Sequence, residues 1–385
     1  MRTARASGFR VALAGCGYWG SKHARILHAD DSVDELVLVD SREDRLRNLA
    51  RTYRTSRSYP ALGAALDHVD AVVVATPPGT HVPLALAAIE AGKHVLVEKP
   101  LALTSSDART LMTAATAAKV VLMVGHTFEY NPAVRKLAEL VRAQELGELY
   151  YLDCARLNLG LYQSDVNVIV DLAPHDVSII NYVLGRKPVA VQAWASRHAH
   201  RQQEDVAYLR LYYDESLDDG GLTANIHVSW LDPCKVRRIT AVGSKKMAVY
   251  DDLAADERIR VLDKGICPPL EGDLTQPPVS YRYGDIFVPF LSPDEPLAVQ
   301  DRHFIECIAS GARPLSDGED GLSVVEAVEA AELSRKLGRP VYLKEVRCGF
   351  GWDNDHALGP WSLPSQPAHR TDSEPLLTVF ESEAG

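Results

Sequence analysis

The sequence predicts an α/β fold with two domains, a parallel sheet covered by helices and then an α+β domain rich in antiparallel strands. Apolar strands alternate with helices from Phe9 to Gly125, and several of these strands are apolar throughout, as in a parallel sheet buried on both faces. After Gly125 several strand-like segments follow one another. The chain of 385 residues also exceeds the size at which a single core usually keeps growing.

The first strand, Phe9 to Ala14, runs into a glycine-rich turn and then an amphipathic helix. Gly15 permits a sharp turn, Gly17 lets backbone approach a pyrophosphate, and Gly20 allows close packing of helix on sheet. Free N–H groups at the helix start favour phosphate. Glycine at these positions also suits a turn that binds no coenzyme. The strand before it and the helix after it favour a Rossmann dinucleotide site, in which Tyr18 and Trp19 are further coenzyme contacts.

Asp40 ends the next strand, Leu36 to Val39, twenty residues after Gly20. A carboxylate at this distance accepts hydrogen bonds from both hydroxyls of an adenosine ribose, and Ser41 beside it is a further coenzyme contact and the cap of a helix to Arg51. Arg42 is an alternative contact for a 2′-phosphate, which Asp40 would repel. The expected cofactor is therefore NAD, with NADP disfavoured.

Two later strands of the parallel sheet also end in polar residues. The bend Thr76-Pro77-Pro78 follows the strand 71–75 and leads to His81, and Glu98-Lys99-Pro100 follows the strand 94–97. Ligands of such sheets bind beyond the carboxyl ends of the strands. We therefore expect Thr76, Pro77, Pro78, His81, Glu98 and Lys99 to line the coenzyme.

Strand-like segments at 188–195, 205–213, 222–230, 237–242 and 246–251 predict a long antiparallel run, and the many prolines between Cys267 and Pro296 predict irregular loops. A last helix is expected at 317–337, between Asp317 and Gly338, and it could pack back on the first domain. The expected domains are residues 1–125 and 126–347. A Pro-rich, acidic tail, 348–385, is either disordered or a docking arm that coenzyme binding does not need.

A net charge of −11 disfavours nucleic acid or an anionic membrane as the main partner. The six cysteines have no C-x-x-C spacing, which is typical of a reduced protein without a structural zinc, and no metal is expected. No apolar segment reaches about 18 residues, and no signal sequence is present. These features predict a cytoplasmic protein with a small-molecule substrate.

Lys99, Asp171 and His175 are the candidate catalytic residues. Lys99 follows a central strand and would point into the coenzyme crevice, although position alone fits a surface lysine equally well. Asp171 and His175 are four residues apart, with Pro174 in the expected first turn of a helix. A neutral imidazole can accept an alcohol proton while hydride leaves the same carbon. A capping aspartate beside an incidental histidine fits this spacing as well.

The chain resembles the Gfo/Idh/MocA oxidoreductases, the glucose-fructose oxidoreductase and inositol dehydrogenase family. The resemblance rests on Gly15-x-Gly17-x-x-Gly20, Ala75-Thr-Pro-Pro-x-x-His81, Glu98-Lys-Pro100 and Asp171-x-x-x-His175. It implies an open-faced, mostly antiparallel second sheet used for homodimers or homotetramers, NAD(P) in the cleft, and Lys99, Asp171 and His175 as the catalytic group. It also implies Tyr130, Arg156, Asn167 and His175 as substrate contacts.

Within that family, 125–132, Ala173-Pro-His-Asp176 and Ser229-Trp-Leu-Asp-Pro233 are most similar to nucleotide-sugar 3-dehydrogenases. The resemblance therefore implies hydride transfer at C3 of a sugar such as UDP-N-acetylglucosamine or its uronic acid. A cyclitol or aminocyclitol dehydrogenase is the alternative enzyme. An NAD(P)-binding regulator without turnover is an alternative of another class, which the presence of Lys99 and His175 disfavours.

Overall fold

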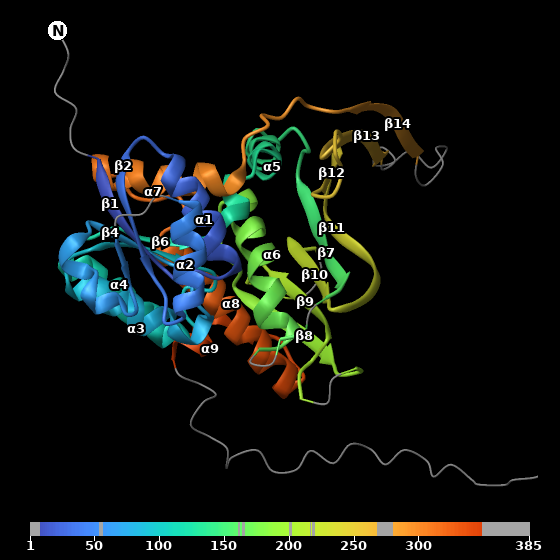
Figure 1. The fold of residues 1–385 in the computed structure, drawn as a ribbon. Coiled ribbons are helices and arrows are strands. Elements are labelled where there is room, and N and C mark those ends of the chain that lie inside the picture. Colours follow the sequence, from blue (N-terminus) through green and yellow to red (C-terminus); the bar gives the residue numbers. More distant parts are fainter. Residues whose placement is uncertain are drawn as a thin grey trace, which may run out of the picture.

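The computed structural model describes residues 8–53, 57–160, 162–163, 166–199, 202–215, 217, 220–267 and 280–348. Two sheets organise these residues, and Figure 1 shows them side by side with helix α8 between them. The predicted tail, 348–385, lies outside the described residues except for Cys348. Within the described part of the chain, no helix is both long enough and apolar enough to cross a membrane.

The first sheet has six parallel strands in the order β3-β2-β1-β4-β5-β6. The order reverses on either side of β1, as in a Rossmann fold, so a crevice opens beyond the carboxyl ends of β1 and β4. Its strands are β1 (Phe9–Ala14), β2 (Val33–Val39), β3 (Arg57–Tyr59), β4 (Ala71–Val74), β5 (His94–Glu98) and β6 (Leu122–Gly125). The predicted parallel α/β arrangement is confirmed.

Helices cover both faces of this sheet. Apolar residues of α3 and α4 pack on one face, and those of α1, α2 and α7 pack on the other. The strands can therefore be apolar on both sides, which explains runs such as Ala71–Val74. These helices are α1 (Tyr18–Ala29), α2 (Glu43–Thr52), α3 (His81–Glu90), α4 (Ser105–Ala118) and α7 (Pro296–Ser310); short 3₁₀ turns are η1 (Leu62–Ala64), η2 (Leu66–His68) and η3 (Pro78–Thr80).

The predicted cap of the helix at 41–51 is wrong. Helix α2 begins at Glu43, and the N-cap position is Arg42 rather than Ser41. The Asp40 carboxylate accepts a hydrogen bond from the Arg42 N–H at 2.8 Å. This short-range bond keeps residues 40–42 in a turn, so the helix cap lies one residue later than the sequence pattern suggested.

The second sheet has nine strands in the order β14-β13-β12-β11-β7-β10-β9-β8-β15, and among them only β10 and β7 are parallel neighbours. The mostly antiparallel sheet is confirmed. The strands are β7 (Leu149–Leu159), β8 (Ala190–Ser196), β9 (Val206–Tyr212), β10 (Thr223–Ser229), β11 (Leu231–Gly243), β12 (Met247–Asp251), β13 (Ile259–Cys267), β14 (Ser280–Phe287) and β15 (Val341–Tyr342).

Strand β14 corrects the prediction of irregular loops between Cys267 and Pro296. It pairs antiparallel with β13 from Cys267↔Ser280 to Val261↔Phe287. The prolines of that stretch lie at 268, 269, 277, 278, 289, 293 and 296, so all fall outside the strand itself. Since proline excludes only the ladder positions that it occupies, the intervening segment can still pair.

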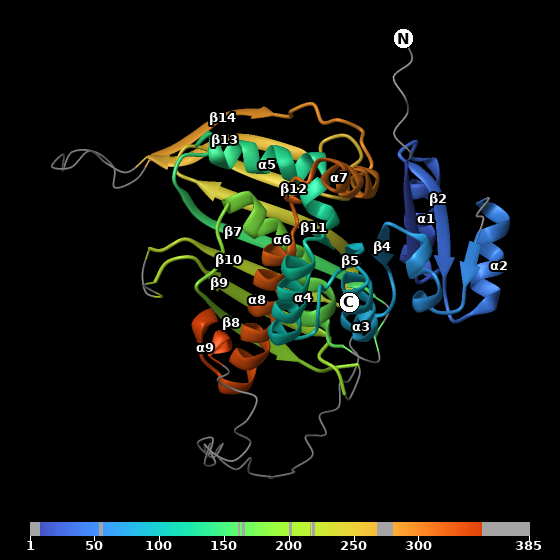
Figure 2. The same ribbon diagram turned by 90° about the vertical axis from the view of Figure 1, so that its left-hand side faces the viewer.

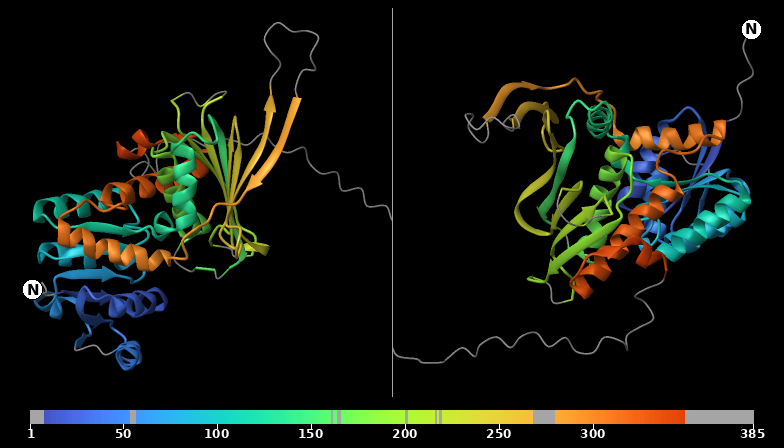
Figure 3. Two further views of the ribbon diagram at one scale, coloured as in Figure 1. Left: turned by 90° about the horizontal axis from the view of Figure 1, so that it is seen from above. Right: turned by 180° about the vertical axis from the view of Figure 1, so that it is seen from behind.

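One face of the second sheet carries the helices, and Figure 3 shows them gathered on one side of it. The helices are η4 (Thr127–Tyr130), α5 (Pro132–Arg142), α6 (Val168–Leu184), α8 (Gly318–Leu337) and α9 (Leu343–Arg347). Figure 2 looks onto the sheet, with α5, α6 and α8 drawn over its strands. Helix α8 contacts β8 and α6 in the half of the chain that contains the second sheet, and α4 and β6 in the half that contains the first. It therefore joins these two halves. Asp317 caps α8, accepting from the N–H groups of Glu319 and Asp320.

Candidate active site

The glycine turn brings β1, α1 and β4 into close contact. Gly15 has a φ of +96°, and a Cβ there would lie 2.5 Å from the Ala75 carbonyl oxygen. A Cβ on Gly20 would lie 1.8 Å from the Gly15 carbonyl oxygen. Gly17 is the N-cap of α1. Among the described residues beyond its chain neighbours, no main-chain atom lies within 4 Å of the place that a Cβ would take there. Two glycines therefore close the turn, and the third leaves open space before the helix start, as a pyrophosphate requires.

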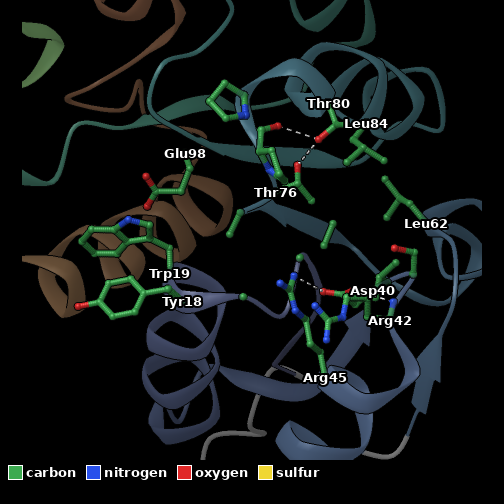
Figure 4. A pocket seen from close by; sticks show the side chains of 18 of the residues that line it. Tyr18, Trp19, Asp40, Arg42, Arg45, Leu62, Thr76, Thr80, Leu84 and Glu98 are labelled. Atoms are coloured by element: carbon green, nitrogen blue, oxygen red, sulfur yellow. Dashed lines mark hydrogen bonds and ion pairs between the residues drawn. The ribbon is translucent and has the colours of Figure 1, made fainter. Parts of the chain in front are cut away.

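A cavity of about 1170 Å³ lies beyond the strand ends of the first sheet. Figure 4 shows Asp40 and Arg45 on one side of it and Glu98 with Trp19 on the other. Its lining includes most of the predicted coenzyme contacts, namely Gly15, Gly17, Tyr18, Trp19, Asp40, Ser41, Thr76, Pro77, Pro78, Glu98 and Lys99. The rest of the lining includes three residues from the part of the chain that follows the first sheet, namely Gln163, Val166 and Asp171. Predicted coenzyme contacts and two of the three candidate catalytic residues, Lys99 and Asp171, thus line one cavity, whereas His175 is not among its described lining residues.

Asp40 is held in place by backbone N–H groups at one end of the cavity. One carboxylate oxygen accepts from the Cys16 N–H at 2.7 Å and the other from the Arg42 N–H at 2.8 Å. The Arg45 guanidinium lies 3.7 Å away. Because a carboxylate offers about four acceptor directions, Asp40 retains capacity for ribose hydroxyls. Arg45 also lines the cavity, but the sequence analysis considered only Arg42, three residues earlier, as a phosphate contact.

His81 lies behind the cavity wall rather than on it. Its ring is 1% exposed and bridges two carbonyl oxygens, that of Pro100 at 2.8 Å and that of Thr76 at 2.9 Å. The Thr80 hydroxyl donates to the Thr76 hydroxyl at 2.7 Å. His81 therefore ties the loop after β4 to the loop after β5 and does not contribute to the lining of the cavity.

Lys99 and Asp171 meet at the other end of the cavity. The Lys99 Nζ donates to the Asp171 carbonyl oxygen at 2.9 Å and lies 3.6 Å from Asp171 Oδ1. The Trp230 indole N–H donates to the other oxygen, Oδ2, at 3.1 Å. The Asp171 carboxylate is thus fixed from both sides. Trp230 stood in a motif quoted for the family resemblance but received no role, because an apolar residue in a strand indicates packing first.

Helix α6 carries Asp171 and His175 and begins earlier than predicted. Asn167 caps it, accepting from the N–H groups of Ile169 and Val170 at 3.1 Å each. Pro174 therefore lies in the second turn, not the first as predicted. Asp171 is helical, so it shares a face with His175 one turn later. The sequence missed this cap because Val168, Ile169 and Val170 resemble a strand more than a first helical turn.

His175 is partly buried next to Phe128, whose ring centroid lies 5.3 Å away. Burial, together with the charges of Lys99, Arg156, Arg237 and His126, holds the pKa of His175 well below its usual value. Among the described residues, the structure has no hydrogen bond between its ring and Asp171. The expected carboxylate partner of His175 is therefore bound to Lys99 instead, and the imidazole is neutral at pH 7.

His126 has the opposite environment. Its Nδ1 lies 2.6 Å from Asp320 and 3.2 Å from Glu129. Burial alone would lower the pKa of His126, but these carboxylates outweigh it and raise the pKa to about 10. Potential ligand atoms of the three side chains lie within 4.8 Å of one another. The short contact between His126 and Asp320 is typical of a charge-assisted hydrogen bond, so His126 is a cation beneath the site.

Three predicted substrate contacts are engaged elsewhere. The Arg156 guanidinium is buried, donates to both oxygens of Asp176 at 2.8 and 2.9 Å, and stacks on Phe128. Tyr130 is 1% exposed and bonds to Ser316 at 2.9 Å. The Asn167 amide donates to Glu204 and Glu332. The structure places these residues in the support of the site, whereas Lys99, Asp171 and His175 are together.

Comparisons with known proteins agree over most of the chain. One family model, an oxidoreductase family with an NAD-binding Rossmann fold, matches residues 9–126, and the GFO/IDH/MocA C-terminal domain matches residues 134–249. A UDP-N-acetylglucosamine 3-dehydrogenase from Acidithiobacillus ferrooxidans is 29% identical over 83% of this chain and 94% of its own. A D-apiose dehydrogenase from Paraburkholderia graminis is 26% identical over 88% and 90%, and a myo-inositol 2-dehydrogenase from Thermotoga maritima is 26% identical over 88% and 99%.

The solved structures similar to this chain include two of relatives with a stated activity or pathway. The structure of the A. ferrooxidans UDP-N-acetylglucosamine 3-dehydrogenase has a TM-score of 0.70 at 26% identity, with 86% of this chain and 98% of that chain covered. GenD2 from gentamicin A biosynthesis, in complex with NAD, has a TM-score of 0.73 at 27% identity, with 88% and 97% covered.

Proposed function

Because the chain belongs to the Gfo/Idh/MocA oxidoreductase family and is an NAD-dependent sugar dehydrogenase, we propose that it acts at C3 of a nucleotide-linked sugar. UDP-N-acetylglucosamine or its uronic acid is the proposed substrate class. Support comes from the 29% identical relative named as a UDP-N-acetylglucosamine 3-dehydrogenase. The observation that carries the proposal is that, of the cations that act on His175, Arg237 has a partly exposed guanidinium, which suits a substrate with negative charge.

Those cations distinguish the proposal from a cyclitol dehydrogenase. Lys99, Arg156, Arg237 and His126 all act on His175. Arg156 is neutralised by Asp176. The Arg237 side chain is 38% exposed and contacts its partner Asp252 through one nitrogen, at 3.3 Å. Arg237 therefore remains able to bind a diphosphate or a uronic carboxylate. Myo-inositol is neutral and gains nothing from such a cation. The inositol dehydrogenases among the relatives nevertheless make cyclitols the second candidate.

The proposed roles follow from the protonation states. Bound NAD supplies a hydride acceptor. His175, neutral at pH 7, accepts the proton of the sugar hydroxyl. Lys99 donates a hydrogen bond to the same oxygen. Asp171 orients the Lys99 ammonium, because its carbonyl oxygen accepts a hydrogen bond from Nζ and its carboxylate lies nearby. Trp230 and Asn167 hold Asp171 and its helix in position. This differs from the expected pairing of Asp171 with His175.

A panel of nucleotide sugars and cyclitols tests the substrate class. Protein with bound NAD is mixed with each compound, and reduction is followed at 340 nm. UDP-N-acetylglucosamine or its uronic acid should reduce NAD, and substrate labelled with deuterium at C3 should pass that deuterium to the coenzyme. Turnover of neutral cyclitols alone would support the second candidate. Stoichiometric NAD binding without turnover of any compound would indicate a regulator.

We also propose a homodimer or homotetramer formed through the open face of the nine-stranded sheet. Trp194 and Tyr208, on neighbouring strands, are 57% and 48% exposed, and Tyr208 stacks on His227 with ring centroids 4.0 Å apart. Exposed aromatic clusters of this kind are common at interfaces. Light scattering should give a multiple of the 42.2 kDa chain mass, and Trp194→Asp should reduce it. A monomeric parent would refute this assembly.

A further inference from the structure

A buried triad of His23, Glu98 and Asp301 joins three elements next to the coenzyme cavity. His23 belongs to α1, Glu98 ends β5, and Asp301 lies in α7. The His23 Nε2 lies 3.0 Å from Glu98, and its Nδ1 lies 3.1 and 2.9 Å from the two oxygens of Asp301. His23 is 0% exposed and Asp301 1%. None of the sequence patterns singled out this set, because the three positions span 278 residues.

Both ring nitrogens of His23 face carboxylates, so both must carry hydrogen and the imidazole is a cation. Burial opposes this charge, but the two carboxylates raise the pKa of His23 to about 10. Burial likewise opposes ionisation of Glu98, yet the hydrogen bond from His23 holds the pKa of Glu98 below its usual value. Burial raises the pKa of Asp301, while the charge of His23 and its hydrogen bond oppose this shift. With both carboxylates ionised, one cation and two carboxylates give the triad a net charge of about −1.

The surrounding chain fixes the Glu98 carboxylate. Its Oε2 accepts from the Lys99 N–H at 3.1 Å, and a Cβ on Gly125 would lie 3.2 Å from that oxygen. Gly125 therefore provides the room that the carboxylate occupies. On the far side of the triad, Gln300 contacts Asp301 at 3.4 Å and accepts from the Thr127 hydroxyl at 2.7 Å. The position of Glu98 thus depends on residues that do not contact the cavity.

Glu98 is the member of the triad that lines the cavity, at the end opposite Asp40 (Figure 4). Since Asp40 marks the adenosine end of a Rossmann site, the nicotinamide belongs at the end of Glu98 and Lys99. The Lys99 ammonium there is already 3.6 Å from the Asp171 carboxylate, so that pair is nearly neutral. The triad therefore gives this end of the cavity its excess negative charge.

We propose that His23 and Asp301 are positioning residues that keep Glu98 ionised beside the nicotinamide, and that the triad thereby favours binding of NAD⁺ over NADH. The physical reason is that the oxidised nicotinamide ring carries a positive charge and the reduced ring carries none. A fixed negative charge stabilises only the oxidised form. Because binding then favours the oxidised form, NADH bound to the protein is a stronger hydride donor than free NADH. The inference rests on the proposed placement of the nicotinamide, and not on the identity of the sugar.

The test measures the dissociation constants of NAD⁺ and NADH for the parent and for Asp301→Asn. Asparagine can still accept from His23, so shape is kept while one charge is lost. Asp301 does not line the cavity. If its role were merely structural, its loss would weaken the binding of NAD⁺ and of NADH alike. We expect Asp301→Asn to shift the ratio of the two constants about tenfold toward NADH. Glu98→Gln should shift it in the same direction. His28→Asn, at an exposed position of the same helix, is the control and should leave the ratio unchanged.

Three outcomes would overturn the proposal. One is equal weakening of both forms in Asp301→Asn, and another is a shift in Glu98→Gln without one in Asp301→Asn. The third needs no variant: a parent protein that binds NADH at least tenfold more tightly than NAD⁺ contradicts a site poised for the oxidised form. These titrations contain no sugar. A wrong substrate class would therefore leave their result unaffected, and their failure would leave the substrate class untouched.

Discussion

The two ends of the coenzyme cavity are built in different ways. At the adenosine end, the residues that matter lie within 31 positions of one another, from Gly15 to Arg45, and backbone N–H groups hold Asp40. At the other end, Lys99 directly follows β5, Asp171 lies in α6, and Trp230 lies at the junction of β10 and β11. Side chains there are held by other side chains, several of them charged and buried.

This difference determines what a substitution does at each end. Backbone N–H groups remain when a side chain changes, so the adenosine end should tolerate replacement and lose only the contact removed. At the other end each charge sets the protonation of its neighbours, as Lys99 and Arg156 do for His175. Removing one group there should change several others. The predictions below test that contrast.

The largest effect is expected for the proposed acid and base. Lys99→Met and His175→Ala should each lower the chemical step about 10²- to 10⁴-fold, the usual contribution of a positioned proton-transfer group. Single-turnover reduction of bound NAD measures that step separately from release. NAD affinity should change little, because the adenosine end holds most of the coenzyme. Variants that keep the parent's single-turnover rate would refute both roles.

The next effect is on stability, and the two halves of the chain again differ. The Arg156 and Asp176 side chains are 8% and 3% exposed and form a bidentate pair. Asp176→Asn should lower the free energy of unfolding by about 3–5 kcal/mol, because it leaves a buried guanidinium unpaired. The matched pair in the first sheet, Arg10 and Asp70, is exposed, and Asp70→Asn should cost about 1 kcal/mol or less. Equal losses in urea unfolding would contradict the contrast.

Asp40→Ala should weaken NAD binding about tenfold, because hydrogen bonds to a charged carboxylate contribute about 1.5–3 kcal/mol. NADP should weaken less or improve, since the repulsion of its 2′-phosphate is removed while Arg42 and Arg45 remain on the lining. Titration of both coenzymes checks this. A parent that already prefers NADP would show that the two arginines outweigh Asp40.

The sequence predicted which residues meet at the Asp40 end of the cavity, for the same reason that this end is simple. Spacing along one strand, turn and helix fixes where Gly15, Gly17 and Asp40 lie, so a local pattern is sufficient. The other end depends on contacts between distant segments. Local spacing placed Asp171 on the face of His175, but nothing local indicates that Lys99 and Trp230 take up its carboxylate. Burial of Arg156, Tyr130 and Asn167 likewise depends on packing that no single segment encodes.

Trp230→Phe tests the support of Asp171. Phenylalanine keeps an aromatic six-membered ring in the buried site but removes the five-membered ring of the indole together with its N–H donor to Asp171 Oδ2. We expect a decrease in kcat of about tenfold with unchanged NAD affinity, because a neutral donor to a carboxylate contributes about 1.5–3 kcal/mol. Tyr162→Phe is a useful control, since the Tyr162 ring packs on Trp230 while its hydroxyl bonds to Asp205. An equal decrease in the control, which keeps the ring and loses only the hydroxyl bonded to Asp205, would refute a specific role for the Trp230 N–H.

The smallest expected effect is that of pH on oxidative turnover near neutrality. Burial and the neighbouring cations lower the pKa of His175 below 6.5, so the proton-accepting form is already dominant at pH 7.5. Raising the pH from 7.5 to 8.5 should then increase the neutral fraction of His175, and with it the rate of oxidative turnover, by about 10% or less. The part of the pH profile in which the rate rises should lie below pH 6.5. His175→Ala should remove that acidic limb. A limb centred above pH 7 that disappears in His175→Ala would show that the surrounding charges raise the pKa, and the coupling inferred for this end of the cavity would then be wrong in sign.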